Sequence, residues 1–342
     1  MKVCVTGGSG FVAKKLCSEL LSAGHNISVL TRQPQVIQYG EIKYFKADLT
    51  TDFDDLVSFL DGCDVLFHCA GEIKNKEKMR SLHVDGTKRL IDAARKIKAS
   101  TGKGIHWVQL SSVGAYGPDQ RDEKNSTRVV LESTLPCPVG EYEVTKKESD
   151  DAVISAGESG AYSYSIVRPS NVFGKGMPNQ SIRSMVSFIK KGLFFYIGKK
   201  DAISTYVHRD DVVDCLVACG FNKGAKGHIF NISNDCPQED FVNAIADHAK
   251  VSRPRVRLPE WFVRAVVGVI GKFISLPLNK ERINALRTKT TYPTDKLEQL
   301  LGFRPKRDLT AYIGEVVQEV NSFAYTNIVI SSDISGRPAR KY

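Results

Sequence analysis

The stretch that decides the fold is Thr6-Gly7-Gly8-Ser9-Gly10-Phe11-Val12-Ala13. A short β-branched run, Lys2 to Thr6, precedes it, and apolar residues spaced by four follow it in a helical pattern. Gly24 is placed to close that helix. The predicted order is therefore strand, glycine turn, helix, and in that context a glycine motif carries structural information.

Each small residue of this turn has a distinct physical role. Gly7 can adopt the backbone angles of a tight turn, and Gly10 lets the chain approach a pyrophosphate without a Cβ in between. Ala13 takes the position where the helix packs closely on the strand. The first N–H groups of the helix, at Phe11 and Val12, then face the phosphates. The stretch predicts a dinucleotide-binding turn.

The composition is that of a globular protein with a basic balance. The 342 residues are 42% hydrophobic and 25% charged, and the formal net charge is +10. Lysine and arginine are spread along the chain, so we expect a general attraction to anions and no nucleic-acid partner. None of the eight cysteines forms a C-x-x-C pair, which predicts reduced thiols and a cytoplasmic location. The N-terminus enters a strand at once, so no signal peptide is expected.

Strand and helix patterns alternate after the turn, which predicts an α/β fold: a Rossmann-type, doubly wound parallel sheet. Ligands collect at the carboxyl ends of such strands, where Arg32, Asp48, Ala70 and Ser112 fall. The further strands are expected at Ile27 to Leu30, Tyr44 to Asp48, Asp64 to His68, Trp107 to Leu110, Ser163 to Val167 and His228 to Ile232.

A second motif lies on a predicted helix, where Tyr142 and Lys146 form Y-x-x-x-K on one face. A lysine ammonium near a phenol favours the phenolate, so we expect a lowered pKa for Tyr142. The phenol can then exchange a proton with a substrate oxygen while hydride moves to or from a nicotinamide. The strand that precedes this helix ends in Ser111-Ser112.

Together, G-x-x-G-x-x-A, S-S-x-x-x-Y-G and Y-x-x-x-K resemble the extended short-chain dehydrogenase/reductase family, in its NAD-dependent epimerase/dehydratase, nucleotide-sugar-modifying branch. The similarity covers roughly residues 1 to 320 and includes Arg168 to Gly174, Tyr206 to Val213 and Leu297 to Pro305. It implies that Ser112, Tyr142 and Lys146 are catalytic, with Ser111 as the alternative serine.

The resemblance also implies the ligand contacts. Arg32, with no acid beside it, favours NADP over NAD, which is kept as the alternative. The substrate residues implied are Ser112, Tyr142, Asn171 and Arg209. The cofactor residues implied are Gly7, Gly10, Phe11, Val12, Arg32, Asp48, Leu49, Ala70, Ser111, Tyr142, Lys146 and Pro169.

Two departures from the family pattern bear on the site. His83 occupies a position where relatives usually carry Asn, and Ser204 stands where sugar-nucleotide epimerases carry a phosphate-gripping Arg. Either Arg209, Arg183, Lys199 or Lys200 supplies that charge, or the substrate is not a conventional nucleoside diphosphate. No metal site is predicted, because no second ligand lies near His68 at zinc spacing.

The expected organisation is a cofactor domain over residues 1–175, joined by about 201–235, and a smaller mixed substrate domain over 176–200 and 236–322. A tail, 323–342, follows. The apolar stretch 261–276 is too short and interrupted to span a bilayer. We expect it to be a core helix, and the alternative of a helix resting on a membrane is not favoured.

The predicted function is an NAD(P)-dependent epimerase or 4-keto reductase that acts on a nucleotide-activated sugar. The first alternative is a hydroxysteroid or lipid-alcohol dehydrogenase, suggested by Ser204 and the apolar stretch. A non-catalytic NADP-sensing protein is the second, and the presence of both Tyr142 and Lys146 argues against it. The resemblance also implies a homodimer formed through residues 79–99 and 142–157.

Overall fold

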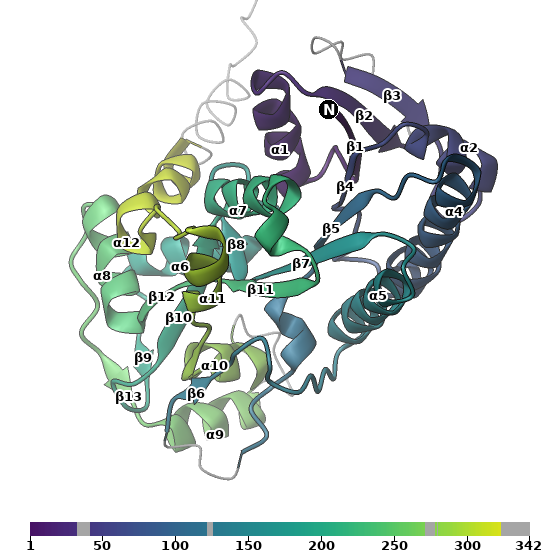
Figure 1. Ribbon diagram of the computed structural model, residues 1–342. Helices are drawn as coiled ribbons and strands as arrows, with labels where there is room; N and C mark the ends of the chain where they lie inside the picture. The colour runs from purple at the N-terminus through teal and green to yellow at the C-terminus, as the bar shows by residue number, and fades with distance from the viewer. Residues whose placement is uncertain (33–41, 122–125, 271–277, 279, 323–342) are drawn as a thin grey trace, which may run out of the picture. The chain divides into compact units, whose positions relative to one another are not determined.

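The computed structural model describes residues 1–32, 42–121, 126–270, 278 and 280–322 (Figure 1). The chain forms two compact units, the first comprising residues 1–172, 205–234 and 290–306 and the second residues 173–204, 235–289 and 307–342. Residues 290–306, which the sequence assigned to the substrate domain, thus belong to the first unit. The predicted tail, 323–342, lies outside the described residues.

The first unit is built on a seven-stranded parallel sheet of order β11-β7-β5-β4-β1-β2-β3, so the predicted doubly wound α/β fold is confirmed. The central strands are buried on both faces, which explains their continuous apolar sequences. The bounds are β1 Lys2–Thr6, β2 Asn26–Thr31, β3 Ile42–Lys46, β4 Val65–His68, β5 His106–Leu110, β7 Ser163–Pro169 and β11 His228–Ile232.

Helices cover both faces of this sheet and bury two separate apolar cores (Figure 1). On one face, α1 (Phe11–Ser22) and α7 (Arg209–Phe221) pack on β1 and β4. On the other face lie α2 (Phe53–Leu60), α4 (Gly86–Thr101) and α5 (Glu141–Glu158), with Trp107 fully buried among them. The helices packed on both faces fix the positions of the strand ends where the predicted site residues lie.

Residues 79–99, which the resemblance places at a dimer contact, fall in three consecutive helical elements. Helix α3 (Lys76–Arg80) runs into a π-helical turn, η1 (Ser81–Asp85), which continues into α4. π-Helical turns occur frequently at functional sites, and this one contains His83.

The remaining elements of the first unit are short. The strand β6 (Arg128–Val129) pairs with β14 (Thr290–Thr291), which ties residues 290–306 to this unit. The other short elements are η2 Val113–Tyr116, η3 Lys223–Ala225 and α11 Asp295–Leu301.

The second unit is mixed, with helices around a small apolar cluster of Ile197, Val263 and Ile283. Its elements are α6 Gln180–Lys190, β9 Tyr196–Ile197, α8 Gln238–His248, β13 Arg257–Leu258, α9 Glu260–Ile270, α10 Lys280–Leu286 and α12 Leu309–Tyr312. A three-stranded sheet of order β12-β10-β8 is formed by β8 Asn171–Phe173, β10 Ile203–His208 and β12 Asn234–Pro237, and the chain passes from one unit to the other within these strands.

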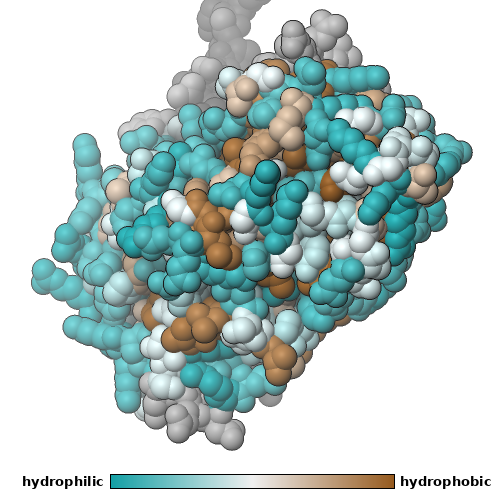
Figure 2. All heavy atoms as spheres, viewed as in Figure 1, coloured by the Kyte–Doolittle hydropathy of each residue, from teal (hydrophilic) through white to brown (hydrophobic). Residues whose placement is uncertain are grey.

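The apolar stretch predicted over 261–276 begins as α9, and residues 271–276 lie outside the described part of the chain. Val263 packs into the cluster at 4% exposure, whereas Trp261 is 73% exposed. Among the described residues, no helix combines the length and the apolar character needed to cross a membrane. On the face drawn in Figure 2, hydrophobic side chains form small separate patches among hydrophilic ones.

Candidate active site

The glycine turn has the geometry of a phosphate cradle. Gly7 has a φ of +68°, and a Cβ at this position would lie 2.7 Å from the Cα of Ala70. Gly10 donates its N–H to the Gly7 carbonyl at 2.8 Å and precedes α1 in an extended conformation. Lys14 donates to the Gly10 carbonyl, so the N–H groups of Phe11 and its two successors precede the helix's own hydrogen-bond ladder. Open helix N–H groups beside a Cβ-free turn fit the diphosphate of a dinucleotide.

The residues predicted to contact the adenosine end lie at neighbouring strand ends. Arg32 is exposed just after β2, and its charge, after the backbone N–H of Lys74, contributes to lowering the pKa of Glu72. Asp48 is half-buried and accepts hydrogen bonds from the Thr50 N–H at 2.8 Å and hydroxyl at 2.7 Å. Leu49 is buried.

The two serines after β5 have different surroundings. The Ser112 hydroxyl accepts from the Gly114 N–H at 3.1 Å. Burial raises the pKa of the Tyr142 phenol, and the nearby Ser112 side chain acts against that rise. Ser111 is 4% exposed and donates to Asp150 Oδ2 at 2.7 Å. Ser112 is thus the serine beside the candidate catalytic tyrosine, while Ser111 is engaged with a buried carboxylate.

The pKa of Tyr142 differs from the sequence expectation. Burial raises it to about 12, the Glu143 carboxylate adds to the rise, and the Ser112 side chain opposes it. The expected lowering by Lys146 was wrong for the protein alone, because the lysine is engaged elsewhere. Its Nζ donates to the Leu110 carbonyl at 2.6 Å and is only 5% exposed. At neutral pH the Tyr142 phenol therefore carries its proton.

A buried group of charges lies around Lys146. Burial lowers the pKa of Lys146 and the nearby Asp150 carboxylate opposes that change. Asp150, fully buried, accepts from Arg168 Nε at 3.1 Å and from a terminal nitrogen of the same guanidinium at 3.0 Å. Its other oxygen, Oδ1, has no hydrogen-bond partner among the residues that the structure describes. Two cations share one carboxylate, which leaves this interior with an excess positive charge suited to a developing phenolate.

His83 links the segment after β4 to the helix that carries Tyr142. Its Nε2 accepts from the Glu72 N–H at 2.8 Å, so Nδ1 carries the proton and donates to the Thr145 hydroxyl at 2.8 Å. The imidazole packs edge-on against the Tyr142 ring, with centroids 5.7 Å apart. Burial, with the Lys146 charge, lowers the pKa of His83 to about 3, so the ring is neutral.

His68 lies in a second buried network. Thr87 donates to the His83 carbonyl at 2.6 Å and therefore accepts from His68 Nε2 at 3.0 Å, which leaves Nδ1 to accept from the Thr6 hydroxyl at 2.6 Å. Thr6 also accepts from the Ala70 N–H at 3.2 Å. Burial lowers the pKa of His68 to about 3. The neutral imidazole braces the base of the glycine turn and acts as a structural group.

The other predicted ligand residues fall at the ends of later strands. Pro169 ends β7 and is buried. Asn171 is exposed and its side-chain amide donates to the Thr205 carbonyl at 3.1 Å. Arg209 begins α7, pairs with Asp210 at 2.8 Å and lies over the Phe11 ring.

The sequence interpretation missed Asp150 and the partner role of Arg168. A signal existed, because Asp150 follows Lys146 by four residues and so shares a helix face with it and with Tyr142. The buried partner, 18 residues further on, depends on the pairing of β5 with β7.

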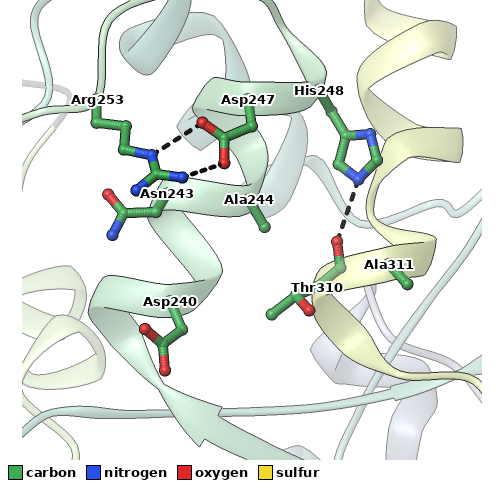
Figure 3. Close-up of a pocket in the computed structure, with 8 residues that line it drawn as sticks. All are labelled: Asp240, Asn243, Ala244, Asp247, His248, Arg253, Thr310 and Ala311. Carbon is green, nitrogen blue, oxygen red and sulfur yellow. Dashed lines mark hydrogen bonds and ion pairs between the residues drawn. The ribbon is translucent and has the colours of Figure 1, made fainter.

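A hollow of about 360 Å³ in the second unit contains none of the predicted residues (Figure 3). There Asp247 accepts two hydrogen bonds from Arg253, at 2.9 and 2.7 Å, and His248 is hydrogen-bonded to the Thr310 carbonyl at 3.1 Å. The Asp247 charge is neutralised within the hollow, and this site has no counterpart of the Tyr142–Lys146 pair.

Comparisons with known proteins agree with this geometry. The family model described as "NAD dependent epimerase/dehydratase family" matches residues 3–233. Sterol-4-alpha-carboxylate 3-dehydrogenase, decarboxylating, from Mus musculus is 25% identical over 93% of this chain and 90% of its own length. The dTDP-6-deoxy-L-talose 4-dehydrogenase (NAD(P)(+)) of Kitasatospora kifunensis is 31% identical over 54% of this chain and 57% of its own length. The structure of UDP-glucuronic acid 4-epimerase from Bacillus cereus in complex with NAD is similar in fold, with a TM-score of 0.72, 18% identity, and coverage of 95% of this chain and 98% of that one.

Proposed function

The chain belongs to the NAD dependent epimerase/dehydratase family, and from that premise we propose that it moves hydride between NAD(P) and a carbinol or ketone carbon of a small-molecule substrate. Ser112, Tyr142 and Lys146 would be the catalytic residues. The observation that carries the proposal is the buried Lys146 side chain, one helical turn after Tyr142, which donates to the Leu110 carbonyl at 2.6 Å. This places the tyrosine helix beside the end of β5, two residues before Ser112, in the sheet whose first turn fits a diphosphate.

The division of labour among these residues follows from their surroundings. A bound nicotinamide dinucleotide supplies the hydride acceptor or donor. Tyr142, protonated at neutral pH, would donate its proton to a carbonyl oxygen in the reductive direction and recover it in the oxidative direction. Ser112 would hydrogen-bond the same oxygen and orient it. Lys146 would stabilise the phenolate in the oxidative direction, because its ammonium lies in an interior with excess positive charge.

The first substrate candidate is a nucleotide-activated hexose, epimerised or reduced at C4. Known nucleotide-sugar enzymes are among the related proteins, and Asn171 lies at the strand end where the family motif contacts a substrate diphosphate. An epimerase would retain its cofactor through the cycle, whereas a reductase would release it.

The second candidate is a sterol or other lipid alcohol. A specific observation favours it: Ser204, 7% exposed in β10, stands where the family pattern places a phosphate-binding arginine. The sterol-4-alpha-carboxylate 3-dehydrogenase of Mus musculus matches over nearly the whole chain, which supports the same candidate.

Two finer assignments complete the proposal. NADP is favoured over NAD because Arg32 is exposed after β2 and no acidic residue adjoins it in the sequence to bind a ribose hydroxyl pair. A homodimer formed through helices α4 and α5 is expected, and light scattering of the purified protein measures it.

The decisive experiment starts from the purified protein. Bound small molecules are released by denaturation and identified by mass, which distinguishes NADP from NAD. Turnover is then measured with UDP- and GDP-hexoses and with 3-hydroxysterols. Replacing Tyr142 by Phe should lower kcat by about 10²- to 10⁴-fold, whereas Tyr162→Phe, which removes another buried hydroxyl, should leave kcat unchanged. Unchanged turnover in Tyr142→Phe would refute the proposal.

A further inference from the structure

Arg209 is a residue that the family pattern does not contain. The segment Tyr206 to Val213 resembles Y-V-H-V-D-D-V, in which the fourth position is valine, and here it is arginine. The sequence alone allowed this charge to serve a substrate phosphate. The structure shows which part of the chain the Arg209 side chain contacts.

The Arg209 side chain contacts Asp210 on its own helix and Phe11 at the start of α1. Its Nε donates to Asp210 Oδ1 at 2.8 Å, and its guanidinium carbon lies 5.1 Å from the centroid of the Phe11 ring. Cation–π contacts of this length are attractive, and the planar guanidinium has five N–H donors in a rigid fork. The side chain is 20% exposed, so it is largely enclosed by these neighbours.

Phe11 is also the first residue of α1, immediately after Gly10. Its N–H group is one of those that would bind the cofactor diphosphate. Arg209 therefore contacts the residue that lines the phosphate cradle, and its positive charge would act on the diphosphate that the cradle binds. Asp210 lowers the net charge of the pair but fixes the plane of the guanidinium, a property that bidentate phosphate recognition requires.

We propose that Arg209 binds the diphosphate of the dinucleotide, as a clamp added in this chain to the glycine turn, and does not bind the substrate phosphate. This inference rests on the proposed function, because it assumes a dinucleotide in the turn. In the family motif the backbone N–H groups of α1 bind the diphosphate, and this inference adds a side chain of α7 to them.

The test compares Arg209→Val with Arg95→Val by isothermal titration. Arg95 is an exposed arginine in α4 that also pairs with a nearby aspartate, so its removal changes the net charge equally. The probes are ADP-ribose, which has the diphosphate without the nicotinamide, and UDP. We expect Arg209→Val to weaken ADP-ribose binding about tenfold, as for one partly screened charge-assisted hydrogen bond. Arg95→Val should match the wild type, and Arg209→Lys should recover part of the loss.

Three outcomes would overturn the inference. They are equal ADP-ribose affinity in Arg209→Val and Arg95→Val, a loss confined to UDP, or Arg209→Val weakening adenosine, which lacks phosphate, as much as ADP-ribose. A wild-type protein that fails to bind ADP-ribose would instead refute the proposed function, and the inference with it. Equal melting temperatures of the two valine variants identify an affinity loss that is not a folding defect.

Discussion

Lowering the pH from 7.5 to 5.5 should destabilise the protein by about 3 kcal/mol through His68 and His83 alone. Burial lowers the pKa of each imidazole from 6.5 to about 3. Between these two values the unfolded chain binds protons that the folded chain excludes, so the free energy of unfolding falls as the pH falls. The loss begins near pH 6.5 and is complete below about pH 3. At pH 5.5 each histidine contributes about 1.4 kcal/mol, from one pH unit below its unfolded pKa.

The assay is urea unfolding at both pH values, followed by the fluorescence of Trp107, which is fully buried in the first unit. A Trp261→Phe background removes the exposed second tryptophan. His83→Asn should reduce the acid-induced loss by about 1.4 kcal/mol, because asparagine does not titrate. The control is His248→Asn, which changes an exposed histidine. If His83→Asn and His248→Asn kept the same pH dependence as the parent protein, the neutral, buried imidazole inferred for His83 would be wrong.

Three further substitutions probe the turn and the buried charges. Gly7→Ala should weaken dinucleotide binding more than tenfold, because the added Cβ would meet the backbone of Ala70. In the control Gly24→Ala, at a φ of +76°, no described atom lies within 4 Å of the added Cβ, so the change should cost only backbone strain of about 1–2 kcal/mol. Equal effects of the two substitutions on thermal stability and on dinucleotide binding would refute this prediction. Asp150→Asn should lower the free energy of unfolding by about 3–5 kcal/mol, measured in urea, since it strands a buried guanidinium; a change below 1 kcal/mol would contradict it. Lys146→Met should abolish most turnover, whereas Lys147→Met, at the neighbouring partly exposed lysine, should preserve it in the same steady-state assay.

The elements that could be predicted from the sequence are those specified by local residue patterns. The strand, turn and helix around Gly7 follow from glycine's conformational range and from apolar residues spaced four apart, and all three elements were confirmed. The Tyr142–Lys146 pair likewise depends only on helix periodicity. Strand ends were less certain: the third strand, predicted over Tyr44 to Asp48, runs from Ile42 to Lys46.

The features that the sequence did not predict depend on contacts between distant residues. At the π-helical turn, the His83 imidazole forms hydrogen bonds with Glu72 and Thr145, which lie far from one another in the sequence. The β6–β14 pairing joins segments about 160 residues apart, and no local pattern announces it. The pKa of Tyr142 is set by its burial and by the engagement of Lys146 with a backbone carbonyl, both of which are properties of the folded protein.

The two hydrogen bonds of the His83 imidazole have a consequence for the order in which the dinucleotide and the substrate bind. One nitrogen of the imidazole holds the backbone of the segment that follows Ala70, where the dinucleotide is expected, and the other holds the helix of Tyr142. A ligand that fixes the position of that segment would therefore also fix the position of the Tyr142 phenol. We therefore expect a compulsory sequence in which the dinucleotide enters first and leaves last, with product inhibition by the departing dinucleotide competitive against the incoming one.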